Sequence, residues 1–532
     1  MVSHENGIRK PSFLQKHFLS ILLFAVILFG FGIRLYQLGD RSIWFDEAAT
    51  SRYIQFPFSE MYQRLHENIH PPAHYTAVKL WRYLFGDSLF MLRGLSVIFS
   101  TVSIFLTYRI ALFLCQQNEN FKKNHERIAG LIAAAFMSIC IFQIRLAWEL
   151  RMYAMGVMLV LLSTYLLLLA FYTKKHLWKI WIFYSLTIAL CAYTHYSTFF
   201  VIAGQFLFIA TRIGYELWRQ KVKNITEQIS LTHALVAISL FVLLFIPWIP
   251  TFLYQKKLVN DGWWDPPFHI NQVLYVLPNL IIPDMVYGIS WTFGGIVVIL
   301  FLLSYILAIF FYGGKGWFLV CVGLVPFALI VIQSIHGTNL ILDRFLSYQQ
   351  PFIIIAFVLA LTKIPLPPLR NLLCLILFFW GIDAYMIYMN KLDIPSSPGA
   401  RGVADYLKEH LEPEDHVVVS NPLLFFPILF YMGPESGITV YAERGNHFAH
   451  FCGAPLVRLP DMTTKYEMSK CPEGQKVWVV TSSGAWGSDF PFYIPETWEK
   501  TGQSKRFRDI FACPPDYIIQ AYIAKSEKQE FE

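Results

Sequence analysis

Predominantly apolar stretches of about 20 residues, the length that crosses the hydrocarbon core of a bilayer, recur along the first three quarters of the chain. The first is FLSILLFAVILFGFGIRLYQL, residues 18–38. A backbone that faces lipid must satisfy its own hydrogen bonds, so runs of this kind predict helices. Only 15% of the residues are charged, whereas soluble proteins devote roughly a quarter to charge. The sequence therefore predicts an α-helical polytopic membrane protein.

We predict about eleven spans. They fall at residues 18–38, 89–115, 128–144, 150–172, 178–193, 197–213, 231–250, 287–311, 317–336, 345–362 and 371–389. Basic clusters at 9–16, 122–127, 174–179 and 212–223 all lie on one side of this alternating topology, which the positive-inside rule makes cytoplasmic. The net charge of +7 is thus a topology signal and no evidence for nucleic acid. We expect a cytoplasmic N-terminus, with the first loop (40–88) and residues 391–532 outside.

The composition changes after residue 390, so we expect a transmembrane domain over 1–390 and a small extracytoplasmic α/β domain over 391–532. RGVADYLKEHLEPEDHVVVS reads as an amphipathic helix followed by a strand, and ITVYAE, KVWVVTSS and DYIIQAYIAK are further strand candidates. This part has no Gly-rich phosphate loop and no nucleophile motif. It looks like an accessory module, in which Cys452, Cys471 and Cys513 allow at most one disulfide.

The first outer loop holds the adjacent carboxylates Asp46 and Glu47, which in most loops would be ordinary solvated charges. The same loop contains His70-Pro71-Pro72, where two prolines restrict the backbone, and an aromatic-rich stretch follows. We expect short helices of this loop to lie on the membrane surface and to present a site at the headgroup level.

A second polar cluster, RLAWELRMY, lies at the outer ends of the third and fourth predicted spans. Its members Arg145, Glu149 and Tyr153 are spaced by four and would share one face of a helix, whereas Arg151 would point elsewhere. Arg145 alone can snorkel to the interface. Glu149 and Arg151 are stronger candidates, because charges at the rim of a span usually face a cavity.

Two further candidates face outside. His195 joins the fifth and sixth spans, and a lone histidine of this kind is more often structural than a ligand. Arg344 opens the tenth span and suits bidentate phosphate recognition at the outer leaflet. The loop 251–286 carries Trp263-Trp264, and tryptophan pairs at an interface more often lie among headgroups than stack on sugars.

In order and topology these elements resemble the GT-C superfamily of membrane glycosyltransferases, specifically family 39, which contains the protein O-mannosyltransferases and the bacterial aminoarabinose transferases. The resemblance covers most of residues 18–389. It is carried by Asp46-Glu47, His70-Pro71-Pro72, Arg93-Gly94-Leu95-Ser96, Glu149-Leu150-Arg151-Met152-Tyr153, Pro247-Trp248-Ile249-Pro250 and Arg344-Phe345 before Pro351. Family members often carry Tyr at the position of Phe345, so no hydroxyl role is assigned there.

The resemblance implies a polyprenyl-phosphate sugar donor, inverting transfer on the outer side, and Asp46 as general base. Glu47 would orient Asp46 or bind the acceptor, and Glu149 and His195 would contact the sugar or the acceptor. The leaving phosphate would be held by His70, Arg151, Arg344 and Tyr153. Asp46 and Glu149 could also hold a divalent cation, since carboxylate oxygens suit such ions. The sequence leaves this metal requirement open.

Undecaprenyl phosphate in a bacterial inner membrane is the expected carrier and location, with dolichyl phosphate as the alternative carrier. Protein, lipid and glycan acceptors all remain open. The main rival function is a transporter or flippase, which would place its binding residues near the bilayer midplane on broken helices. A polysaccharide polymerase or ligase and a sugar-binding receptor are further rivals. The charges of this chain gather instead at outer span ends.

Overall fold

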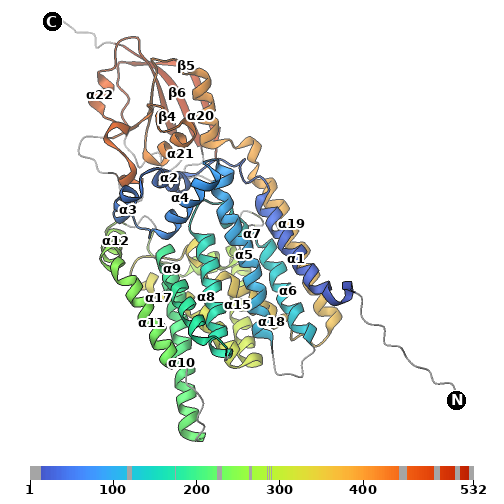
Figure 1. The fold of residues 1–532 in the computed structure, drawn as a ribbon. Helices are drawn as coiled ribbons and strands as arrows, with labels where there is room; N and C mark the ends of the chain where they lie inside the picture. Colours follow the sequence, from blue (N-terminus) through green and yellow to red (C-terminus); the bar gives the residue numbers. More distant parts are fainter. Residues whose placement is uncertain are drawn as a thin grey trace, which may run out of the picture.

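The computed structural model describes residues 13–116, 123–173, 175–223, 231–262, 266–283, 286, 288, 290–442, 448, 452–483, 492–509 and 516–525. A bundle of long helices is joined to a smaller part that contains a β-sheet, and three short helices, α2 to α4, lie between the two (Figure 1). The predicted fold class, a polytopic α-helical membrane protein with a small α/β part, is confirmed.

The bundle is built from helices of very different lengths. They are α1 (Phe13–Leu35), α5 (Leu89–Cys115), α6 (Lys123–Ile139), α7 (Ile141–Ala147), α8 (Tyr153–Tyr172), α9 (Leu177–Thr194), α10 (Thr198–Lys223), α11 (Leu231–Phe245), α12 (Ile249–Asp261), α13 (Asn271–Asn279), α15 (Trp291–Tyr312), α16 (Gly314–Leu319), α17 (Val325–His336), α18 (Gln350–Leu361) and α19 (Pro367–Leu392). Within the described residues, nine helical segments are long and apolar enough to cross a membrane, and the bent pair α6 and α7 makes a tenth. The predicted span 345–362 contains only the 12-residue α18, which follows a 3-10 turn at Asp343–Leu346.

The predicted span 128–144 is not a single straight helix. The chain bends by 61° between α6 and α7, at Cys140. The guanidinium of Arg34 on α1 is completely buried there and donates to the carbonyl oxygens of Met137 (3.1 Å) and Ser138 (2.8 Å). These carbonyls belong to the last turn of α6, whose oxygens lose their helical partners at the break. The buried cation therefore stabilises a bend that periodicity alone does not reveal.

The polar cluster after this bend departs from the predicted helix. α7 ends at Ala147 and α8 begins at Tyr153, so a turn separates Arg145 from Tyr153. The expectation that Arg145, Glu149 and Tyr153 share one helical face is therefore wrong. The turn instead sends Glu149 and Arg151 to different sides, as the site geometry shows below. The seventh predicted span also differs, because the helical path continues past residue 250 to Asp261 after a 3-10 turn at Ile246–Trp248.

The C-terminal module, residues 399–525, holds a mixed six-stranded sheet in the order β3-β2-β1-β4-β6-β5. The pairs among β3, β2, β1 and β4 are parallel, and β6 is antiparallel to both β4 and β5. Its elements are α20 (Gly399–His410), β1 (His416–Val419), α21 (Pro422–Met432), β2 (Thr439–Tyr441), β3 (Met462–Thr463), α22 (Lys465–Ser469), β4 (Lys476–Ser482), β5 (Trp498–Arg508) and β6 (Asp516–Ala524). The predicted helix and four predicted strands are present, whereas β3, β5 and the buried helix α21 were not predicted.

The three short helices of the first outer loop are α2 (Phe45–Gln55), α3 (Phe58–His66) and α4 (Ala73–Phe85). They share one hydrophobic core with the C-terminal module, in which Ala48, Tyr53 and Met61 pack with Phe425 and Trp478. Cys452 and Cys471 of the module are free thiols, and Cys513 lies outside the described residues, as do Trp263 and Trp264. The loop that carries Asp46 and Glu47 thus lies between the bundle and the module.

Candidate active site

Asp46 and Glu47 lie in the first turn of α2, where the positive end of the helix dipole favours carboxylates. Successive residues of a helix point in different directions, about 100° apart. The two neighbours therefore enter different surroundings. Glu47 is completely buried, while the side chain of Asp46 keeps 23% of its surface exposed.

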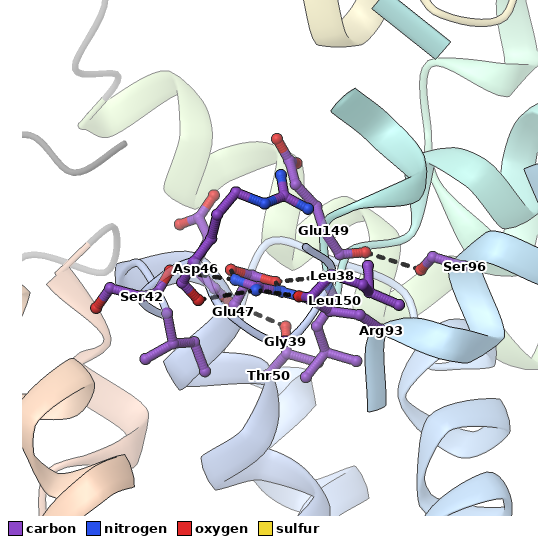
Figure 2. Close-up of polar contacts among 12 residues, drawn as sticks. Leu38, Gly39, Ser42, Asp46, Glu47, Thr50, Arg93, Ser96, Glu149 and Leu150 are labelled. Atoms are coloured by element: carbon purple, nitrogen blue, oxygen red, sulfur yellow. Dashed lines mark hydrogen bonds and ion pairs between the residues drawn. The ribbon is translucent and has the colours of Figure 1, made fainter. Parts of the chain in front are cut away.

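Glu47 is held by a bidentate ion pair. Its carboxylate accepts from Arg93 Nη2 (2.6 Å) and Nε (2.8 Å), and also from the backbone N–H of Leu150 (2.7 Å). Arg93, on α5, donates in addition to the carbonyls of Leu38, Arg41 and Ser42. Figure 2 shows this cluster, with Ser96 also donating to the carbonyl of Glu149. Glu47 thus ties α2 to α5 and to the turn 148–152.

Asp46 lies between two arginines. Its Oδ2 is 3.6 Å from Arg151 Nη2 and 3.5 Å from Arg344 Nη1. Arg151 is also fixed to α2 by donating to the carbonyl of Asp46 (3.2 Å) and to Thr50 Oγ1 (3.1 Å). A part-exposed carboxylate is therefore aligned with two cations, one of them rigidly anchored.

Two histidines stand beside this trio. Arg151 Nη2 lies 2.9 Å from His70 Nε2, and because a guanidinium only donates, His70 accepts there and is neutral. Removal from water, with the neighbouring charges of Arg151 and Arg344, lowers the pKa of His70 well below its usual value. His195 packs 5.9 Å from the His70 ring and 5.5 Å from that of Tyr153, between centroids. Burial, and then Arg151 and Arg344, lower the pKa of His195 to about 3.

Arg344 lines two cavities. The smaller, of about 90 Å³, is lined by Asp46, His70, Arg151 and Tyr153. The larger, of about 930 Å³, is lined by four arginines, by carboxylates and by aromatic and amide side chains. These include Arg41, Arg93, Arg145, Arg344, Glu47, Glu149, Asp343, Trp148, Trp291, Tyr275, Tyr388, Asn271 and Gln272. Its volume falls within the range of small-molecule sites, about 300–1,000 Å³.

Glu149 belongs to the larger cavity. Burial raises its pKa to about 7, an effect that Arg145 opposes and Glu47 reinforces. Arg145 itself lies 3.7 Å from Asp343. A carboxyl group of this kind can donate or accept a hydrogen bond near neutral pH, which suits contact with a sugar hydroxyl.

The predicted site residues are thus divided between two neighbouring sites. Asp46, His70, Arg151, Tyr153 and Arg344 converge on the smaller cavity, and His195 packs behind them. Glu47 and Glu149 border the larger one. Within the described residues no three His, Cys, Asp or Glu side chains gather in a way that could hold a metal ion.

Sequence reasoning gave no role to several residues that line the two cavities. Arg93 was noted only as part of a motif, although it neutralises Glu47. Arg41, whose guanidinium lies 3.7 Å above the Trp148 ring, and the module residues Gly453 and Leu456 also line the cavities. The basic residues of the first loop were a usable signal for Arg41. Nothing local marks Gly453 or Leu456.

The comparisons with known proteins concern the family resemblance and the fold. The family model of the dolichyl-phosphate-mannose-protein mannosyltransferases matches residues 69–249. No curated protein sequence matches the chain. The crystal structures of ArnT from Cupriavidus metallidurans, one bound to undecaprenyl phosphate and one in the apo state, each superpose with a TM-score of 0.58 at 12% identity, over 95% of this chain and 98% of that one.

The S. cerevisiae Pmt1-Pmt2 complex bound to the sugar donor superposes with a TM-score of only 0.33 at 12% identity, over 46% of this chain and 34% of that one, which is too low to bear on the site. None of these similarities supports a transporter or flippase. The resemblance to the GT-C membrane glycosyltransferases is confirmed, by a family model over residues 69–249 and by the ArnT fold over nearly the whole chain.

Proposed function

We propose that this protein is an inverting glycosyltransferase that moves a sugar from a polyprenyl-phosphate donor to an acceptor on the extracytoplasmic side of the membrane. The observation that carries the proposal is the part-exposed carboxylate of Asp46, which lines the smaller cavity 3.6 Å from Arg151 and 3.5 Å from Arg344, an arginine that also lines the larger cavity. The family model and the fold shared with ArnT, which is known with undecaprenyl phosphate bound, support this donor class.

Asp46 is the general base of this reaction. Its carboxylate takes the proton of the acceptor hydroxyl as the acceptor oxygen forms its bond to the anomeric carbon. The bond between that carbon and the phosphate oxygen breaks on the opposite face of the sugar, and its electron pair leaves with the lipid phosphate. Arg344 and Arg151 stabilise the negative charge that develops on the phosphate. Atoms and charge balance with one proton transferred to Asp46.

The pairing of Asp46 with both arginines suggests how the base becomes available. An incoming phosphate is a stronger partner for a guanidinium than a carboxylate held at 3.5–3.6 Å, because it accepts several hydrogen bonds. Donor binding draws Arg344 toward the phosphate. Asp46 then loses part of its compensation and is free to accept the acceptor proton.

The larger cavity holds the sugar-phosphate part of the donor. Its arginines match the phosphate, its aromatic side chains match the sugar face, and Glu149 matches a sugar hydroxyl. Arg344 lines both cavities and therefore places the phosphate next to the pocket of Asp46. His70 is a neutral neighbour of Arg151 that keeps this guanidinium aligned. Glu47, fully engaged by Arg93, positions Asp46 and does not bind the acceptor.

We place the protein in a bacterial inner membrane with undecaprenyl phosphate as carrier. The test is transfer of radiolabelled sugar by purified protein in native lipid extract, from a panel of undecaprenyl- and dolichyl-phosphate sugars. The same panel is run with and without a chelator. Label reaching an endogenous acceptor from one donor supports the proposal and identifies the sugar. No transfer from any donor by well-folded protein contradicts it.

A further inference from the structure

The C-terminal module makes direct contact with the loop that carries Asp46. Tyr431, at the end of α21, accepts a hydrogen bond at its hydroxyl from the backbone N–H of Ile43 (2.9 Å). Arg401, on α20, donates from its side chain to the carbonyl of Gly39 (2.6 Å) and from its backbone to Ser42 Oγ (3.3 Å). The segment just before Asp46 is therefore held by the module and not by the bundle alone.

Tyr431 and Arg401 are in contact with each other. The Arg401 guanidinium lies 5.4 Å from the Tyr431 ring centroid, in cation-π geometry. Lys408 on the same helix donates to the Tyr431 carbonyl (2.7 Å). The ring of Tyr431, whose hydroxyl accepts from Ile43 N–H, is thus held by Arg401, and its backbone is held by Lys408.

The module also contacts the part of the loop that follows Asp46. Arg64 on α3 donates to the carbonyl of Pro455, and Arg52 on α2 lies 3.8 Å from Asp461, with both side chains buried. α2 itself packs on α21 and shares its hydrophobic core. Gly453 and Leu456 of the module line the pocket of Asp46. Contacts of the module therefore occur before, along and after the helix that carries the base.

We infer that the C-terminal module is a positioning element of the catalytic centre, in which Tyr431 and Arg401 set the placement of Asp46 through Ile43 and Gly39. This inference rests on the proposed function and assigns catalytic importance to a part that its sequence marks only as accessory. Neither residue lines a cavity with Asp46, so both act through the backbone of the loop.

The test compares Tyr431→Phe and Arg401→Gln with wild type. Tyr431→Phe removes only the hydroxyl, and Arg401→Gln removes the charged guanidinium that reaches the carbonyl of Gly39. Because small displacements of a reacting group can cost up to about 100-fold in rate, we expect kcat to fall about tenfold, with KM for the donor unchanged. Arg401→Lys keeps a long, positively charged donor and should restore most of the loss. Tyr522→Phe is the matched control, since Tyr522 packs against Trp498 in a separate core of the module.

Hydrogen–deuterium exchange of residues 43–56 gives a second reading that needs no activity. If no donor is turned over, faster exchange there in Tyr431→Phe, and not in Tyr522→Phe, supports the inference, which separates its failure from that of the proposed function. Unchanged exchange and unchanged kcat in both variants overturn it. A lower melting temperature with unchanged kcat per folded molecule also overturns it, because Tyr431 would then be merely structural.

Discussion

The carboxylate of Glu47 and the guanidinium of Arg93 form a buried bidentate pair, with contacts of 2.6 and 2.8 Å and side chains at most 3% exposed. The pair joins α2 to α5, and through Leu150 N–H it joins both to the turn that carries Arg151. The arrangement fixes α2, which carries the proposed base Asp46, relative to the turn that carries Arg151.

Breaking the Glu47–Arg93 pair should destabilise the protein more than most substitutions do. Glu47→Gln leaves Arg93 as an uncompensated buried charge, and such losses cost about 3–5 kcal/mol. We expect a clearly lower melting temperature in detergent and loss of transfer. The double variant Glu47→Gln with Arg93→Met should recover part of the stability and none of the activity. If Glu47→Gln is as stable as wild type, the pair does not contribute to stability in this way.

Arg344 should control donor affinity. A hydrogen bond to a charged group contributes about 1.5–3 kcal/mol, so Arg344→Ala should weaken donor binding by roughly ten- to a hundredfold. Arg344→Lys should recover it only partly, because lysine lacks the bidentate fork. Arg151→Ala should lower turnover as well, since Arg151 also anchors Asp46 and Thr50. Binding is measured with labelled donor.

The control for these variants is Arg506→Ala, which removes an exposed arginine paired with Asp516 in the module. It should leave donor binding unchanged. If Arg344→Ala and Arg151→Ala also bind the donor as wild type does, neither arginine contacts the phosphate.

Glu149 should make stability depend on pH around neutrality. Its pKa is raised to about 7 in the folded protein, so between its unfolded value near 4.5 and 7 the folded state holds a proton that the unfolded state has released. Stability from this group is therefore full below about 4.5 and falls as pH rises to 7. The difference in melting temperature between wild type and Glu149→Gln should change over this window. The exposed Glu412→Gln should show no such change.

His195 should act in the opposite direction. Its Nδ1 accepts from Ser197 N–H at 3.3 Å, so the ring is neutral, and its pKa is lowered to about 3. Unfolded histidine binds a proton below about 6.5, so stability is lost as pH falls below that value. His195→Gln should lose less melting temperature than wild type when the pH is lowered from 6.5 to 5. The exposed His416→Gln should show the same pH dependence as wild type. A difference in melting temperature between wild type and His195→Gln that stays the same at pH 6.5 and pH 5 would contradict the neutral assignment.

The fold was predictable where a local pattern decided it. Long apolar runs predicted the bundle helices because each helix satisfies its own backbone. The bend at Cys140 was not predictable, since it depends on Arg34 from another helix. β5 was missed because an edge strand with one polar face, broken by an irregularity between Lys500 and Ser504, lacks the usual alternation.

The candidate site was also predictable only in part. Asp46 was identifiable as a carboxylate of the first outer loop, and Arg151 and Arg344 as charges at outer span ends, and the structure brings them together. Glu47 is buried, unlike Asp46, because it pairs with Arg93. Arg93 comes from another helix, and no local pattern specifies this pairing. The contacts of Tyr431 and Arg401 with the first loop are equally long-range.

The most direct test of the central claim is single-turnover transfer by Asp46→Asn, with donor and acceptor saturating. Asp40→Asn, an exposed aspartate of the same loop, is the control. Because general base catalysis contributes about 10²–10⁴-fold, the account predicts a loss of that size for Asp46→Asn, with donor binding and melting temperature retained and Asp40→Asn equal to wild type. Transfer by Asp46→Asn at the wild-type rate would contradict Asp46 as the base.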